Sequence, residues 1–127
     1  MSAQIDRTIL VVDDDEPTRV TLQDLLEHDG YNAMGAPDGF LAARIVRQES
    51  IDLVFLDVDM PGRSGIDVLR EIRIINELLP VIMLTGTSDT DIFQWALEAG
   101  AFSLLPKPVD IGQIRLTVQH ALFGFQF

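Results

Sequence analysis

The sequence predicts an α/β protein in which five short strands alternate with five helices. Short runs of β-branched and aliphatic residues recur along the 127 residues, and turn-forming residues bound each run. The segments between these runs carry apolar residues at helical spacing instead. Strict alternation of this kind implies a parallel sheet with right-handed crossover connections.

The first strand is expected at residues 8–12, where the run TILVV leads into three aspartates. A helix follows because Pro17 suits a first helical turn, Asp15 or Glu16 can cap it, and Gly30 suits its end.

The remaining elements follow from the same signals. Residues 31–36 form a weaker run, and we expect this second strand to be peripheral. The run at 53–56 is apolar at successive positions, as in a strand that helices cover on both faces. Further strands are expected at 81–84 and 101–105, and helices from Asp38-Gly39 onward and at 64–77, 89–99 and 110–123.

Composition narrows the class of protein. A chain of this length forms one domain, here 1–127 with its core at about 8–123, and it has no Cys for disulfides or thiolate metal sites. The formal net charge of −11 argues against direct nucleic-acid binding. No apolar run reaches membrane-spanning length, so we expect a cytoplasmic protein without membrane insertion.

Reactive side chains follow four of the five expected strands. They are the acidic pair Asp13 and Asp14, then Asp57, Thr85 and Lys107, which is the single lysine of the chain. Because the carboxyl ends of parallel strands lie along one rim, the fold is expected to gather these groups there.

Three neighbouring carboxylates repel one another, by about 4 kcal/mol for a pair roughly 4 Å apart near a protein surface. Aspartates without His or Cys suit a hard cation, Mg²⁺ or Mn²⁺, which would relieve this repulsion. An Asp at a strand end beside such a cation suggests phosphoryl chemistry. Asp57 would be the nucleophile, while Lys107 and the Thr85 hydroxyl would contact phosphoryl oxygens.

The motifs VVDDDE, VFLDVDMPG, VIMLTG and LPKP, in this order and spacing, resemble the response-regulator receiver domain of two-component signalling. The resemblance spans residues 8 to about 123. It implies a flavodoxin-like three-layer α/β/α sandwich with strand order 2-1-3-4-5. It also implies a signalling switch rather than an enzyme with external substrates, phosphorylated with Mg²⁺ by a histidine kinase or histidine phosphotransfer protein.

By motif position, the resemblance implies that Asp57 is the phosphoacceptor, Thr85 the switch hydroxyl and Lys107 the phosphoryl-binding lysine. The metal ligands would be Asp14, Asp57 and the backbone carbonyl of Asp59, with Asp13 acting partly through water. The Lys107–Pro108 peptide would be cis.

Two positions depart from the family pattern. Leu104 stands where the family has its switch aromatic, three residues before the lysine, so a hydroxyl readout is not expected there. Asp59, two residues after the phosphoacceptor, adds a carboxylate that can repel the phosphoryl group or orient the attacking water.

The output surface is the other expectation that follows from the resemblance. The family uses the face formed by its fourth helix, fifth strand and fifth helix. Here Phe93, Trp95 and Leu104, with Leu97 or Leu116, would line that face for an output protein or a homodimer, unless they are simply packed. The chain would be a stand-alone receiver or one excised from a larger regulator.

Two other functions fit parts of the pattern. Asp57-Val58-Asp59 after an apolar strand also resembles the nucleophile motif of haloacid-dehalogenase-type phosphatases, which would make the protein a small metal-dependent phosphohydrolase. Pro61 stands where that family has Thr or Val, and the acidic pair precedes the nucleophile. A degenerate receiver that only binds protein is the third possibility, and the complete set of five reactive residues argues against it.

Overall fold

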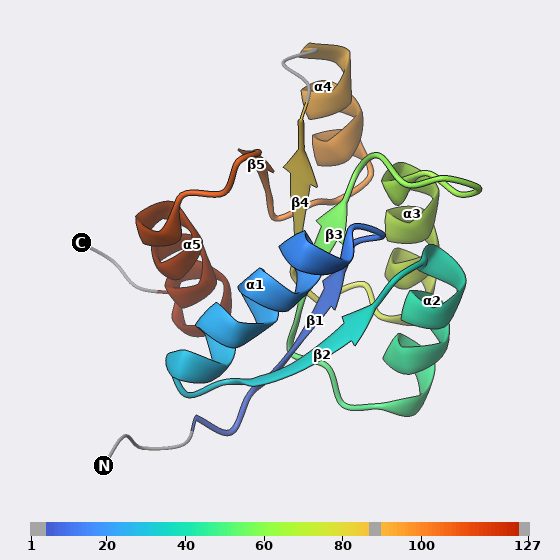
Figure 1. Cartoon of the computed structure of the whole chain (residues 1–127). Coiled ribbons are helices and arrows are strands. Elements are labelled where there is room, and N and C mark those ends of the chain that lie inside the picture. Colours follow the sequence, from blue (N-terminus) through green and yellow to red (C-terminus); the bar gives the residue numbers. More distant parts are fainter. Residues whose placement is uncertain (1–4, 87–89, 125–127) are drawn as a thin grey trace.

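A computed structural model describes residues 5–86 and 90–124 as a three-layer α/β/α sandwich (Figure 1). The strands are β1 (Thr8–Val12), β2 (Asn32–Ala36), β3 (Leu53–Asp57), β4 (Val81–Thr85) and β5 (Ser103–Pro106). The helices are α1 (Glu16–His28), α2 (Gly39–Gln48), α3 (Gly65–Ile75), α4 (Thr90–Glu98) and α5 (Ile111–Phe123).

The five strands form one parallel sheet in the order β2-β1-β3-β4-β5. This confirms the flavodoxin-like topology, including the peripheral place of the second strand. The strand order reverses between β1 and β3, and open α/β sheets bind ligands beside the carboxyl ends of the strands at such a point.

Alternating side chains of the strands make two separate cores. Leu10, Val54 and Met83 face α2, α3 and α4, whereas Val11 and Phe55 face α1 and α5. β1, β3 and β4 are buried along nearly their whole length, which explains their unbroken apolar sequences.

Element ends differ from the expected bounds by one or two residues, for local reasons. Ser64 lies outside α3 because it is the N-cap, and its side chain accepts a hydrogen bond from the backbone N–H of Asp67. The same helix ends at Ile75 because Asn76 is extended. β5 begins at Ser103 instead of residue 101, because the Ala101 N–H bonds to the Ala96 carbonyl and closes α4. The expected first residue of α4, Asp89, lies outside the described residues.

In the part of the chain that the structure describes, no helix has both the length and the apolar character needed to cross a bilayer.

Candidate functional site: an acidic cluster at the carboxyl rim of the sheet

The loop after β1 places the acidic pair. Asp13 is 1% exposed, and its Oδ1 accepts a hydrogen bond from the Asp15 N–H at 2.9 Å. Asp15 in turn caps α1, its carboxylate accepting from the Thr18 N–H at 3.1 Å. Asp14, between them, is exposed. The cap therefore fixes the turn that directs one aspartate inward and leaves the next accessible.

Asp57 ends β3 and is 2% exposed. Its Oδ1 lies 3.2 Å from Lys107 Nζ and accepts a hydrogen bond from the Asp59 N–H at 3.3 Å. Burial away from water, with the charge of Asp13 added, raises the pKa of Asp57 to about 6 despite the nearby ammonium. At neutral pH the carboxyl group is therefore mostly ionised but held in an unfavourable environment.

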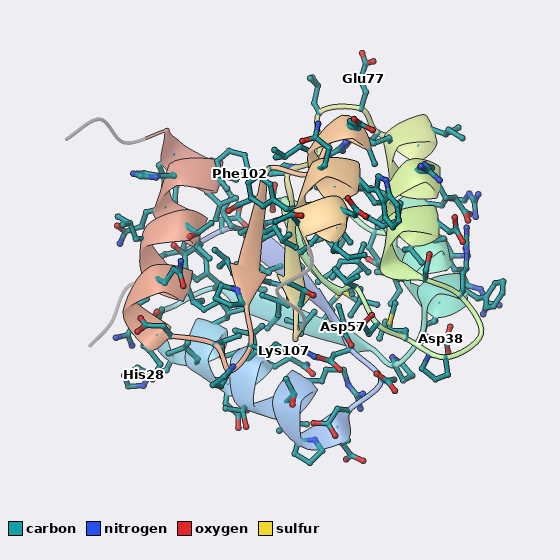
Figure 2. The ribbon with its side chains drawn as sticks, turned by 90° about the horizontal axis from the view of Figure 1, so that it is seen from above. His28, Asp38, Asp57, Glu77, Phe102 and Lys107 are labelled. Atoms are coloured by element: carbon teal, nitrogen blue, oxygen red, sulfur yellow. The ribbon has the colours of Figure 1, made fainter. Side chains whose placement is uncertain are left out.

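Lys107 follows β5 and connects two strand ends. Its Nζ lies 3.1 Å from Asp13 Oδ2 as well as 3.2 Å from Asp57 Oδ1. Figure 2 shows Lys107 and Asp57 close together at this rim of the sheet. Burial lowers the pKa of Lys107, but the hydrogen bond to Asp13 and the charge of Asp57 outweigh this and hold the pKa above its usual value. The lysine is thus charged throughout the physiological range. The Lys107–Pro108 peptide is cis, as the resemblance implied.

Thr85 lies on the same rim. It ends β4, is 5% exposed, and its backbone carbonyl accepts from the Lys107 N–H at 2.8 Å. In the register of the sheet Asp57 pairs with Leu84, the residue before Thr85. The structure therefore brings together the groups that the sequence placed at strand ends.

The carboxylates form a candidate metal site. One oxygen from each of Asp13, Asp14 and Asp57 lies within 4.8 Å of the others. Oxygen donors with no His or Cys fit a hard divalent cation such as Mg²⁺. A cation there would also offset the repulsion from Asp13, which adds to burial in raising the pKa of Asp57.

Leu104, which the resemblance places at the switch-aromatic position, lies on β5 opposite Met83. It packs on the core that faces α2, α3 and α4, and it is only partly buried. Phe93 and Leu97 of α4 are 50% and 45% exposed, and Leu116 of α5 is 46% exposed.

Trp95 was expected on the same face, and this prediction was wrong. The indole lines a groove together with Ile66 and Arg70 of α3 instead. Two positions separate Trp95 from Phe93, which places them on different sides of a helix. The sequence of α4 has apolar residues on two sides of the helix, and it does not indicate which neighbouring element each side contacts.

Gly65 is a contributor to the site that sequence reasoning missed. Its N–H donates to the Val58 carbonyl at 2.9 Å. A Cβ at this position would lie 2.4 Å from the Asp57 carbonyl oxygen and 2.8 Å from Val58 Cα. The start of α3 thus packs directly on the backbone that carries Asp57. Gly after the Ser64 cap was the available signal, but nothing local reveals so close an approach.

A buried carboxylate, an acidic pair and a lysine lie together at the switch point of this parallel sheet, and metal-assisted phosphoryl transfer uses groups of these kinds. The family profile of the response regulator receiver domain matches residues 9–119. The chain therefore belongs to the response regulator receiver family, whose members are phosphorylation-dependent signalling switches.

Individual relatives agree with this assignment. The chain is 38% identical over 114 residues to sporulation initiation phosphotransferase F of Bacillus subtilis, covering 90% of this chain and 92% of that protein. It is 40% identical over 114 residues to the transcriptional regulatory protein ZraR of Escherichia coli, covering 90% of this chain but only 26% of ZraR.

Solved structures give the same result. A response regulator receiver domain protein from Clostridium thermocellum superposes with a TM-score of 0.87 at 37% identity, over 91% of this chain and 94% of that one. The chemotaxis protein CheY4 of Vibrio cholerae superposes with a TM-score of 0.88 at 27% identity, over 93% and 100%. The phosphohydrolase alternative is not favoured by these relationships.

Proposed function

We propose that Asp57 is the phosphoacceptor of this receiver, and that a histidine kinase or a histidine phosphotransfer protein supplies the phosphoryl group. The observation that supports this most strongly is the position of Lys107 Nζ, 3.1 Å from Asp13 and 3.2 Å from Asp57. An ammonium held between the candidate nucleophile and a candidate metal ligand is suited to charge that develops on a phosphoryl oxygen.

In the proposed reaction, a carboxylate oxygen of Asp57 attacks the phosphorus atom. An acyl phosphate P–O bond forms while the P–N bond of the donor phosphohistidine breaks. The side chains of Asp13, Asp14 and Asp57, with the backbone carbonyl of Asp59, would hold Mg²⁺ or Mn²⁺. That cation supplies charge neutralisation for the phosphoryl oxygens when bound.

The remaining side chains have separate roles in this proposal. Lys107 contacts one phosphoryl oxygen, and the Thr85 hydroxyl donates to another after phosphorylation. The added charge of about −1.5 to −2 at one strand end then biases the protein toward a second arrangement. Leu104, which packs on the core under α4, would repack without offering a hydroxyl.

Output is proposed through the face formed by α4, β5 and α5, because Phe93 and Leu97 of α4 and Leu116 of α5 have exposed side chains. An output protein or a second copy of this chain would bind there. We further propose that 1–127 acts as one receiver domain with no catalytic activity beyond its own phosphorylation and dephosphorylation.

Intact-mass measurement after incubation with acetyl phosphate and Mg²⁺ tests the chemistry. We expect one phosphoryl adduct on the wild-type protein, none on Asp57→Ala, and loss of labelling with excess EDTA. Asp24→Ala on α1 is the matched control and should label like wild type. Equal labelling of Asp57→Ala would contradict the proposal. Turnover of a generic phosphate monoester would support the phosphohydrolase instead.

A further inference from the structure

A groove of about 370 Å³ lies between α3 and α4, outside the proposed output face. Val58, Ile66 and Ile92 contribute its apolar surface, and Val58 and Ile66 are only 4% and 8% exposed. Trp95 contributes an indole that is 50% exposed. A half-exposed Trp beside buried aliphatic side chains is characteristic of surfaces that accept an anchor residue from a partner.

The polar rim of this groove is acidic on both sides. Asp59 and Asp67 line it from the loop after β3 and from α3. On α4, Asp91 lies four positions before Trp95 and Glu98 three positions after it, so both share the side of the helix that carries the indole. Both are exposed, and Gln94 donates to Glu98 at 3.2 Å.

One cation is found among the described residues that line the groove. Arg70 Nη1 lies 3.8 Å from Asp67 Oδ1, and the two side chains are 65% and 59% exposed. An exposed pair of this kind contributes little and exchanges readily with another cation. The groove therefore already accommodates one guanidinium at its rim.

We infer that the α3–α4 groove binds a basic amphipathic segment of a partner protein. An aliphatic side chain of that segment would enter the apolar part of the groove. Its arginine or lysine side chains would lie over the Trp95 indole and beside Asp59 and Asp67. Charge complementarity favours this occupant over a second copy of the chain, because each copy carries a formal net charge of −11.

Trp95 is the single tryptophan of the chain, so its fluorescence reports on the groove directly. The probe is an acetylated and amidated amphipathic peptide of leucine and arginine, with matched peptides that carry citrulline or glutamate in place of arginine. We expect a saturable change in emission with the arginine peptide on the unphosphorylated full chain. The citrulline peptide should bind at least tenfold more weakly, and the glutamate peptide should not bind.

Two substitutions should move the affinity in opposite directions. Asp67→Asn removes a rim carboxylate and should weaken arginine-peptide binding about three- to fivefold. Arg70→Gln removes the internal competitor and should strengthen it by a similar factor. Asp24→Asn, an equal change of charge on α1 across the sheet, is the control and should leave the affinity unchanged.

A non-saturable response would overturn the inference, as would equal affinity for the citrulline and arginine peptides. An equal loss in Asp24→Asn and Asp67→Asn would also overturn it, because the attraction would then be a general charge effect. None of these outcomes depends on phosphorylation of Asp57, so failure here is distinct from failure of the proposed function.

Discussion

The carboxyl group of Asp57 is almost fully buried, yet it lies near a second buried carboxylate, Asp13. Burial and the charge of Asp13 both make ionisation of Asp57 unfavourable. The ammonium of Lys107 offsets part of this effect, but the pKa of Asp57 is still raised to about 6. Perturbed pKa values of this kind are frequent at functional sites, because the charged groups there have to bind a cation and an anionic ligand.

The raised pKa predicts that Asp57→Asn stabilises the metal-free protein at neutral pH. The folded-state pKa of about 6 lies above the ordinary aspartate pKa of 3.8, so between these two pH values the folded state binds more protons than the unfolded state. Stability from this group therefore falls as pH rises through that window. Urea unfolding in EDTA at pH 7 should show a gain of up to about 3 kcal/mol for Asp57→Asn.

The gain should shrink near pH 5, where the wild-type carboxyl group is already mostly protonated in the folded state. Asp24→Asn is again the exposed control and should show no such pH dependence. A loss of stability in Asp57→Asn at pH 7 would show that the ion pair with Lys107 outweighs burial.

Asp59 is predicted to set the lifetime of the phosphorylated state. Its side chain is exposed two residues after Asp57, and its N–H donates to Asp57 Oδ1. A carboxylate beside the phosphoryl group can accept a proton from the attacking water, so Asp59→Asn should slow dephosphorylation about tenfold. Decay of the phosphorylated mass measures this, with Asp67→Asn as control. Unchanged or faster decay in Asp59→Asn would contradict this role.

For the site residues, the sequence predicted which side chains take part better than it predicted how buried each one is. The aspartates, Thr85 and Lys107 were recognisable because they follow apolar runs. Burial of Asp13 beside an exposed Asp14 was not, because it depends on the Asp15 cap and on Lys107, which is distant in sequence. Trp95 was misplaced for the same reason, since its neighbours come from α3.

At the scale of elements, the connection from β3 to α3 holds the candidate nucleophile in place. Met60 in this connection is buried, and Gly65 contacts the backbone of Asp57 and Val58. α3 is also joined to its neighbours by charged side chains. Glu71 pairs with Arg63 of this connection and with Arg47 of α2, the latter at 2.7 Å.

Gly65→Ala should therefore disturb both stability and phosphorylation. The new Cβ would overlap backbone atoms, so the chain has to shift, and overpacking of this kind costs about 1–3 kcal/mol. Urea unfolding and acetyl phosphate labelling should both show a loss. Gly112→Ala in the first turn of α5 is the control, because its Cβ would meet only Asp110 Oδ1, at 3.3 Å. Equal behaviour of the two variants would contradict the proposed close contact.

Element type and order were predictable because each strand is a short apolar run and each helix has its own cap or stop signal. Asp38 and Asp110, for example, cap α2 and α5 through side-chain hydrogen bonds at 2.8 and 2.9 Å. Which helix side meets which neighbour was not predictable, because contacts such as Arg73 to the Gly100 carbonyl depend on the assembled fold.

At the scale of the whole molecule, parallel strands bring Asp13, Asp57, Thr85 and Lys107 to one rim although 94 positions separate the first from the last. The site and the α3–α4 groove share the Asp59 loop, so a partner in the groove would lie next to Asp57, the proposed phosphoacceptor. The sheet topology places both the strand-end residues and the groove at this rim. For this reason a few residues that follow the strands were enough to indicate the site from sequence.

Trapping the acyl phosphate and locating it in the sequence tests directly whether Asp57 is the phosphoacceptor. After labelling with acetyl phosphate and Mg²⁺, borohydride reduces an aspartyl phosphate to homoserine, which tandem mass spectrometry of peptides identifies by position. We expect homoserine at position 57 and unmodified aspartate at 13, 14 and 59. Homoserine at any of those three positions instead of 57, or at none of the four, would contradict it.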